Sequence, residues 1–232
     1  MNNGKNLILN FLFLETALEL VPKEIRTHSS VKKDAKRRRK KPSKIILDDS
    51  KHHTAMRILD KKEKRGRPDI IHQCLLSLLD NPFRDYFRVY IHTFDNKIIW
   101  INSQTRLPRN YNRFIGLMED LFEKKVIKTD NLKLLEILDA DLDTLLKNID
   151  PPVVILMREK GKKDSLEKYL EANAVIAIGA FPHGDFEDKT LNILGRYNLV
   201  EISFGEKPCT SLYITNKVAI ICENFITKSK PL

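Results

Sequence analysis

Cysteine is scarce in this 232-residue chain, and the three present, Cys74, Cys209 and Cys222, stand far apart. Zinc clusters and disulfide frameworks need paired cysteines, so we expect neither, and a reducing cytoplasmic compartment fits best. Long apolar runs are also missing, because no stretch approaches the roughly 20 apolar residues that a membrane-spanning helix needs. We therefore expect no membrane partner.

The segment NLILNFLFLE, residues 6–15, is the one candidate for a targeting signal. It contains two asparagines, ends on Glu15, and lacks both a positively charged start and a small-residue cleavage site. We therefore predict a buried first strand. The remaining composition, 42% hydrophobic and 31% charged, is typical of a globular protein, and we expect a single domain over residues 1–232.

Positive charge is concentrated in one segment. The run KKDAKRRRKKPSK, residues 32–44, has nine Lys or Arg and one Asp, a net +8 of the +10 carried by the whole chain. Such a run neutralises phosphates, so RNA is the expected partner. A solvated loop with no specific role and a nuclear import signal are the alternatives. We expect residues 28–45 to form a mobile basic insertion.

Apolar periodicity predicts several helices and one hairpin. Pro68 suits a first helical position and Asp69 a first turn, and RVYIHTFDNKIIWI alternates around a turn at Asp95 and Asn96. The predicted helices are TALELVPKEI up to about Pro22, residues 68–80, a helix starting at Pro108 with Phe114, Leu117, Leu121 and Phe122 on one face, residues 131–148, and DSLEKYLEA at 164–172. We expect residues 65–125 to form an RNA-binding elaboration.

The last third of the chain has a different sequence pattern. PPVVILMREKG, AVIAIGAFPHG and LVEISFGEKPCTS are each a short apolar run followed by a polar, glycine-containing loop. This pattern indicates an α/β fold with a parallel sheet. Ligands bind such sheets outside the carboxyl ends of the strands, so these three loops are expected to converge on a site.

The loop in VIAIGAFPHGDF, residues 175–186, lacks the nucleotide-binding fingerprints. Gly179 and Gly184 are not spaced as in GxGxxG, and the Gly-Lys-Ser/Thr of a phosphate-binding loop is missing. Backbone recognition remains, with Ala180, Phe181 and Pro182 as an apolar wall for a flat, mostly neutral ring. The alternative is a tight turn that simply needs two glycines.

No metal site is expected. His183 and Asp185 have no visible partner cluster. His52 and His53 stand beside Asp48 and Asp49, but adjacent residues on a strand or helix point apart.

Arginines gather before two predicted helices. Arg65 and Arg67 precede Pro68, and three more surround Pro108: Arg106, Arg109 and Arg113. Cations oppose the helix dipole there, so anion binding explains the placement, with Arg109 and Arg113 on one helical face. Asp69 could orient Arg67 or cap the helix. Tyr111 is a plausible stacking residue, whereas Phe114 belongs to the core stripe.

Together these segments resemble the SPOUT-class pseudouridine N1-methyltransferases, which act on small-subunit ribosomal RNA during ribosome biogenesis. The resemblance rests on RGRPDIIHQCLLSLLDNP, IHTFDNKIIWIN, TRLPRNYNRFIGLMEDL, IGAFPHGDF and the loop before LYITNKVAIICENF. It implies a parallel sheet flanked by helices with a C-terminal trefoil knot, and a homodimer. The basic run departs from the family pattern, and the scarcity of glutamine is compatible with a heat-adapted archaeal cytoplasm.

The resemblance also implies the site residues. S-adenosylmethionine would lie bent in the knot loops, against Met157, Gly179, Gly184, Thr210, Ser211, Leu212, Tyr213, Ile214 and Thr215. Arg67, Arg106, Arg109 and Arg113 would bind the RNA, and Arg67 and Asp69 are the expected catalytic residues.

The implied reaction is attack of pseudouridine N1 on the sulfonium methyl group, with the target base flipped into the pocket. Asp69, Asp185 and His183 are the candidate bases, with water or the RNA as alternatives. Two other functions stay open: a non-catalytic rRNA-binding ribosome assembly factor, and a nucleic-acid-binding regulator that uses the basic run alone.

Overall fold

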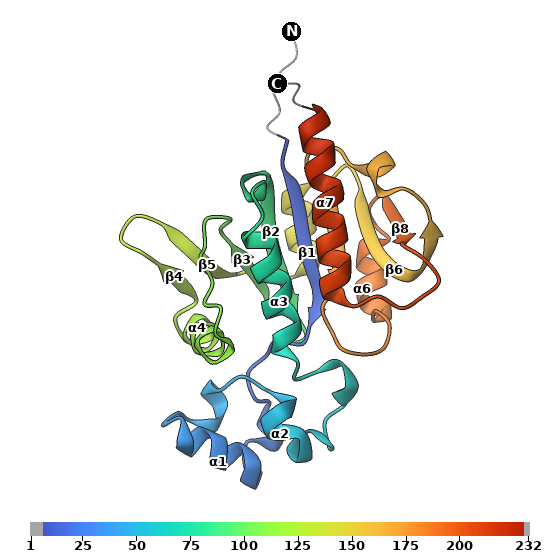
Figure 1. The fold of residues 1–232 in the computed structure, drawn as a ribbon. Helices are drawn as coiled ribbons and strands as arrows, with labels where there is room; N and C mark the ends of the chain where they lie inside the picture. Colours follow the sequence, from blue (N-terminus) through green and yellow to red (C-terminus); the bar gives the residue numbers. More distant parts are fainter. Residues whose placement is uncertain (1–6, 230–232) are drawn as a thin grey trace.

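An eight-stranded sheet runs through the molecule in the computed structural model, which describes residues 7–229 (Figure 1). The strands are β1 (Leu9–Thr16), β2 (Phe87–Thr93), β3 (Ile98–Ile101), β4 (Val126–Lys128), β5 (Lys133–Leu138), β6 (Val154–Lys163), β7 (Val175–Gly179) and β8 (Leu199–Ser203). Their spatial order is β4-β5-β3-β2-β1-β7-β6-β8. The neighbours from β2 to β8 are parallel, and β3, β5 and β4 continue the sheet in antiparallel fashion. The predicted α/β fold is confirmed.

Helices cover both faces of this sheet, so the domain has three layers (Figure 1). On β1, Phe11 and Phe13 join the core cluster under α3, α4 and α7, whereas Leu12 and Leu14 join the cluster under α5 and α6. This alternation follows from the two-residue repeat of a strand. The helices are α1 (Ser29–Arg37), α2 (Asp49–Met56), α3 (Pro68–Leu79), α4 (Tyr111–Lys124), α5 (Leu142–Ile149), α6 (Asp188–Leu194) and α7 (Ser211–Ser229).

Three predicted elements are confirmed. The apolar segment near the start forms β1, which is buried along its whole length, although Asn6 and the rest of residues 1–6, like residues 230–232, lie outside the described residues. Helix α3 begins at Pro68 with Asp69 in its first turn. The hairpin forms β2 and β3, with Asn96 at a φ of 62° in the turn. Both hairpin strands belong to the main sheet.

The helix expected in TALELVPKEI is wrong. β1 continues to Thr16, Leu20 forms a β-bridge with Ile46, and only Lys23–Ile25 form a short 3₁₀ turn. The backbone hydrogen bonds go to a second segment instead, because Val21 N–H donates to the Ile45 carbonyl at 2.9 Å. Tertiary pairing, which no local pattern reveals, overrides the helical spacing.

The basic run is also not a mobile loop. It forms α1, whose first turn is capped by His28, and this helix packs with α2 on a separate small apolar cluster below the sheet (Figure 1). The carboxylate of Glu119 on α4, 2% exposed, accepts hydrogen bonds from Arg38 at 2.6 Å, Lys40 at 2.8 Å and Ile46 N–H at 3.0 Å. The run is therefore held to the domain by a buried carboxylate.

Three other boundaries needed correction. Residues 131–148 hold β5 before α5, since short apolar runs do not distinguish a strand from a helix. Only Leu166–Tyr169 are helical in the segment 164–172, as a 3₁₀ turn. Helix α4 begins at Tyr111 rather than Pro108, because the Asn110 side chain caps it by accepting from Arg113 N–H. Arg109 therefore does not share a helical face with Arg113.

The order of the last strands brings three loops together. β7 follows β6 in the chain but lies between β1 and β6 in space, and β8 lies on the outer side of β6. Helix α7 then returns to pack beside α3. The loops after β6, β7 and β8 therefore leave the same edge of the sheet. The trefoil knot stays a prediction.

Candidate active site

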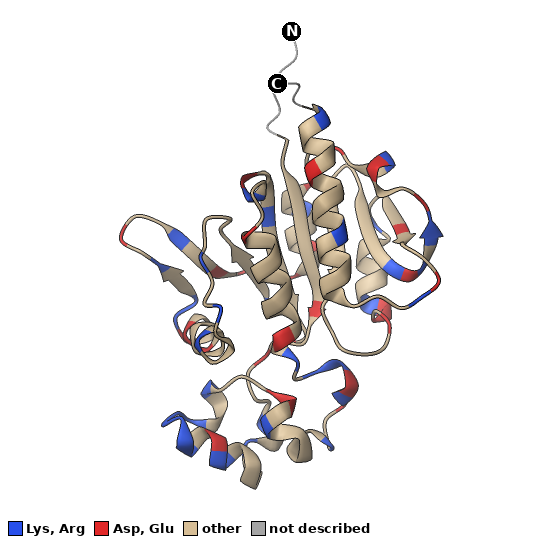
Figure 2. Ribbon diagram, in the orientation of Figure 1, with Lys and Arg blue, Asp and Glu red and all other residues tan. Residues whose placement is uncertain are grey.

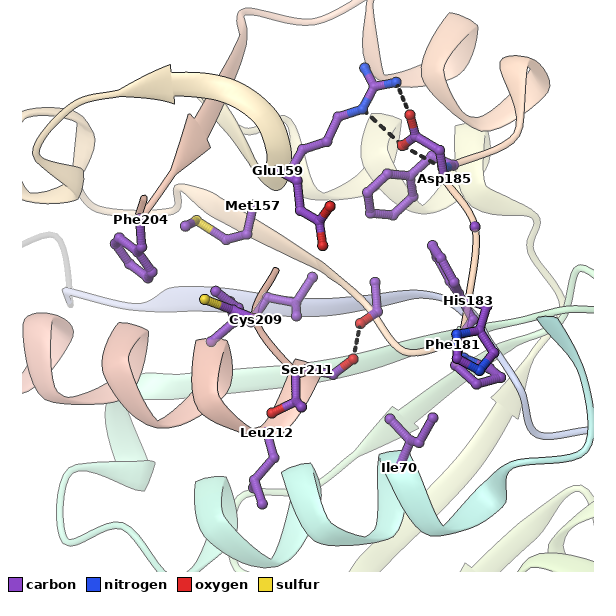
Figure 3. Close-up of a pocket in the computed structure, with 18 of the residues that line it drawn as sticks. Ile70, Met157, Glu159, Phe181, His183, Asp185, Phe204, Cys209, Ser211 and Leu212 are labelled. Carbon is purple, nitrogen blue, oxygen red and sulfur yellow. Dashed lines mark hydrogen bonds and ion pairs between the residues drawn. The ribbon is translucent and has the colours of Figure 1, made fainter. Parts of the chain in front are cut away.

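A cavity of about 560 Å³ lies at the carboxyl ends of β6, β7 and β8 (Figure 3). Its walls come from the three strand ends and their loops, the first residues of α7, and the start of α3. This is where ligands bind in parallel α/β sheets, and its size lies within the range of small-molecule pockets. The predicted convergence of the three loops is confirmed.

Seven of the nine residues expected at the cofactor line this cavity: Met157, Gly179, Gly184, Thr210, Ser211, Leu212 and Ile214. The other two do not. Tyr213 is half exposed on the outer side of α7. Thr215 is fully buried, and its hydroxyl donates to the Ser211 carbonyl at 2.8 Å, so it is bound to the helix backbone and does not line the cavity.

The loop after β7 forms the wall opposite α7. Phe181 and Phe186 meet edge to face, with ring centroids 5.3 Å apart. A Cβ on Gly179 would lie 2.9 Å from the Phe181 ring and 3.0 Å from the Phe186 ring, so glycine here makes room for these rings. The Gly179 carbonyl accepts from the Ser211 hydroxyl at 2.6 Å, which ties the loop to α7. Ala180, expected in the wall, is buried beneath it.

Asp185 is bound to two cations. Arg158 donates to both carboxylate oxygens, at 2.9 and 2.6 Å, and Lys160 lies 2.9 Å away. The hydrogen bonds from Arg158 hold the pKa of Asp185 well below its usual range. A carboxylate held this way is a poor proton acceptor at neutral pH. Asp185 therefore closes the loop rather than acting as the base.

A buried lysine anchors the same loop from the opposite side. Lys64, 3% exposed, donates to the Glu15 carboxylate, to the Asp185 carbonyl at 2.6 Å and to Glu187 at 3.2 Å. Its ammonium group lies 4.3 Å from the centre of the Phe181 ring. Glu15 also accepts from Glu187 N–H at 2.8 Å. The loop is therefore fixed by Glu15 at the end of β1 and by Lys64 in the 3₁₀ turn between α2 and α3.

Arg67 and Asp69 stand at the rim of the cavity. The guanidinium group donates to both oxygens of Asp69, at 2.8 and 2.7 Å, and both residues line the cavity. This hydrogen bonding raises the pKa of Arg67, so the guanidinium stays charged. Of the two roles considered for Asp69, orienting Arg67 is the one that the geometry shows.

The other predicted arginines lie outside the cavity. Arg106, Arg109 and Arg113 are exposed, and Arg109 pairs with Asp80 at 2.7 Å. Arg65 is structural, because both its Nε and Nη2 donate to buried Glu19 at 2.7 Å.

The expected stacking residue is not free either. The Tyr111 hydroxyl donates to Asp48 at 2.9 Å, and burial raises the pKa of Tyr111.

Sequence reasoning missed several residues of the cavity. Glu159 directs its carboxylate into the centre in Figure 3 and forms no ion pair with the described residues. The apolar side chains of Ile178, Ile202 and Phe204 also line it. Glu159 could have been found from its place directly after the β6 run. The others carried no local signal beyond hydrophobicity.

Among residues 7–229, no group of three or more His, Cys, Asp and Glu residues is placed to hold a metal ion. His52 is fully buried, whereas His53 is exposed and pairs with Asp49 at 2.9 Å, so the two rings do point apart. None of the described helices is long and apolar enough to cross a membrane.

The fold and the cavity define an α/β protein with a ligand site at the carboxyl ends of three parallel strands. The sequence profile of the EMG1/NEP1 methyltransferase family matches residues 11–223. The chain belongs to the EMG1/NEP1 methyltransferase family.

Known relatives agree with this assignment. The ribosomal RNA small subunit methyltransferase Nep1 of Archaeoglobus fulgidus is 53% identical over 213 residues, which cover 92% of this chain and 94% of that protein. The Nep1 of Pyrococcus furiosus is 44% identical over 222 residues, covering 93% and 96%. The crystal structure of Archaeoglobus fulgidus Nep1 bound to S-adenosylhomocysteine matches with a TM-score of 0.88 at 51% identity, over 93% of this chain and 97% of that one. The resemblance drawn from the motifs is confirmed.

Proposed function

We propose that this protein transfers a methyl group from S-adenosylmethionine to N1 of a pseudouridine in small-subunit ribosomal RNA, as part of ribosome biogenesis. The observation that carries the proposal is the cavity at the three strand ends, with the Arg67–Asp69 pair at its rim. Membership of a methyltransferase family and the activity for which the relatives are named support the reaction class. Pseudouridine N1 is proposed because uridine has no free N1 hydrogen.

The residues of the cavity fit S-adenosylmethionine. Met157, Ile178 and Leu212 supply apolar surface for an adenine ring. The free carboxylate of Glu159 complements the positive charges of the methionyl part. When bound, this cofactor supplies an electrophilic methyl group. We propose that the cofactor is held by Met157, Gly179, Gly184, Thr210, Ser211, Leu212 and Ile214.

The RNA would lie along the side of the cavity formed by the start of α3 and would extend from there toward α4. Arg67 lines the cavity, Arg106 and Arg109 are exposed in the segment before α4, and Arg113 is exposed in the first turn of α4. Figure 2 shows further Lys and Arg on α1 and the N-terminal segment below the sheet. These groups neutralise phosphates. Unstacked loop bases can be flipped into a pocket of this kind.

In the proposed reaction, a bond forms between pseudouridine N1 and the methyl carbon as the sulfur–carbon bond breaks. The N1 proton leaves to solvent water at the open rim. The two hydrogen bonds to Asp69 fix the orientation of the Arg67 guanidinium group. Arg67 then positions the RNA so that N1 lies in line with the methyl group. Asp185 is excluded as the base, since Arg158 and Lys160 already bind its carboxylate.

We further propose a cytoplasmic homodimer with a trefoil knot in its C-terminal segment. The outer side of α7 carries exposed apolar groups, with Tyr213 51% and Ile220 57% exposed, and such side chains favour a subunit interface. Sedimentation equilibrium would report the mass of the particle. A monomer at micromolar concentration would contradict the dimer.

The test of the proposed function is methyl transfer from labelled S-adenosylmethionine to two short hairpins that differ only in pseudouridine or uridine in the loop. Mass spectrometry of the product nucleosides should show N1-methylpseudouridine from the first hairpin and no methylated product from the second. Transfer to neither hairpin, with RNA still bound tightly, would contradict the proposal and favour a ribosome assembly factor without catalysis.

A further inference from the structure

A second cavity, of about 350 Å³, lies beside the first one between α2, the 3₁₀ turn Lys62–Lys64 and the loop after β7. Three residues line both cavities: Arg67, Pro182 and His183. The two spaces therefore meet along a shared wall, and Arg67 stands at the junction. A volume of this size accommodates a small ligand such as one nucleotide.

The charges in this second cavity favour an anionic ligand. Arg65 forms an ion pair with Glu19, and Arg67 forms one with Asp69. Arg57 and Lys62 are exposed and have no ion-pair partner among the described residues, so they are available to an incoming group. The carboxylates in the lining are Glu63 and Asp49, and Asp49 is engaged by His53. Uncommitted cations of this kind bind phosphates.

The uncharged part of the lining suits a planar ring. Pro182 presents an apolar face, and the imidazoles of His53 and His183 are exposed flat groups on opposite sides of the lining, one from α2 and one from the loop after β7. Unstacked RNA bases bind to such surfaces. A cavity with both free cations and exposed rings therefore matches a nucleotide better than an inorganic anion.

We propose that the second cavity holds the nucleotide adjacent to the methylated one, with the phosphate between the two nucleotides at Arg67. A base that flips into the first cavity carries its neighbour toward the shared wall, and Arg57 and Lys62 then contact the next phosphate. The inference rests on the proposed function. Under this proposal, residues 49–67, which line most of the second cavity, contribute to specificity for the RNA sequence or shape around the target.

The test uses the full chain and hairpins with pseudouridine in the loop, either intact or with an abasic residue on the 5′ or the 3′ side of it. Fluorescence anisotropy measures RNA binding, and single-turnover transfer with saturating S-adenosylmethionine measures catalysis. For the wild type, an abasic residue on one side should weaken binding about tenfold, as expected for one lost stacking contact. The abasic residue on the other side should have little effect.

Two variants separate the parts of the site. Arg57→Ala with Lys62→Ala should lower the salt dependence of binding by about 1.4 in slope, about 0.7 for each lost phosphate contact on a single strand. His53→Ala should leave the slope unchanged but remove the penalty of the abasic residue. The matched control is Arg88→Ala with Lys228→Ala, two exposed cations on β2 and α7 outside both cavities. It should alter neither measurement.

The proposal is overturned if neither abasic hairpin binds more weakly, if the penalty persists undiminished in His53→Ala, or if the salt dependence is unchanged in the variant with Arg57→Ala and Lys62→Ala. Failure of the proposed function is read separately: the wild type would methylate no hairpin, whatever the abasic residues did to binding.

Discussion

Single side chains decide how the loop after β7 is held. Lys64 is buried against Glu15, and it also reaches the Asp185 carbonyl and Glu187. Gly179 leaves space for two aromatic rings on the same loop. Both residues shape the wall of the cavity, and neither has a side-chain group free to bind a ligand. Substitutions at these positions therefore test the wall separately from the chemistry.

Lys64→Met is expected to weaken S-adenosylmethionine binding and lower the stability by about 3 kcal/mol, because it leaves the Glu15 carboxylate buried without its cation. Calorimetric titration and urea unfolding would measure the two effects. The control is Lys61→Met, which removes an exposed partner of the same Glu187 and should change the stability little, because an exposed ion pair is screened by solvent. Equal cofactor affinity in the two variants would show that Lys64 does not position the loop.

Gly179→Ala should displace the Phe181 and Phe186 rings, because the new methyl group would lie 2.9 and 3.0 Å from them. We expect at least tenfold weaker cofactor binding by calorimetric titration. Gly116→Ala is the matched control: a Cβ there meets nothing within 4 Å, and alanine in a helix interior should stabilise α4 by about 0.5–1 kcal/mol. An unchanged cofactor affinity in Gly179→Ala would show that the two rings can move to accommodate the methyl group without loss of binding.

At the scale of elements, α4 connects the domain to the basic segment. Glu119 on α4 binds Arg38 and Lys40 from the segment around α1, together with the Ile46 N–H. The six consecutive basic residues 36–41 would repel one another in isolation. The buried carboxylate explains why this part of the chain is ordered.

Glu119→Gln should therefore destabilise the protein by about 3 kcal/mol, since an amide cannot balance two cations in a buried position. Proteolysis should become faster within residues 28–45 before it does elsewhere. Glu123→Gln, at another position of α4, removes an exposed ion pair with Lys44 and should change the stability little. If both variants were equally stable and equally resistant to protease, Glu119 would not be the anchor.

At the scale of the whole molecule, three buried histidines make stability depend on pH. Burial lowers the pKa of His52, His72 and His92 below the ordinary value of 6.5. Below pH 6.5 the unfolded chain binds protons that the folded chain does not. Stability is therefore complete above pH 6.5 and falls as the pH drops toward the folded pKa values, by at most about 1.4 kcal/mol per pH unit for each histidine.

Urea unfolding at pH 7.5 and pH 5.5 should show this loss in the wild type. His52→Gln should reduce the difference between the two pH values, because His52 is fully buried and its Nδ1 accepts from Asp48 N–H at 3.1 Å. His53→Gln, at an exposed position, serves as the control and should leave the difference unchanged. A wild type equally stable at both pH values would contradict the account.

The sequence by itself determined the α/β class, the helix at Pro68, the hairpin, the family, and the loops that meet at the site. These features have local causes: a two-residue or 3.6-residue apolar repeat, a proline at a helix start, or a motif of several residues in order. Seven of the expected cofactor residues line the cavity because short loops directly after parallel strands have little freedom in where they lie.

Only the tertiary structure decided the rest. Residues 19–21 pair with residues 45–47, and residues 135–138 pair with β3, and both pairings overrode an apparent helical spacing. The basic run folded because Glu119, some 80 residues away in the chain, compensates it. Asp185 and Arg65 look like free functional groups in the sequence, yet Arg158 and Glu19 engage them. The common reason is that charge pairing and strand pairing join residues distant in sequence, which no local pattern records.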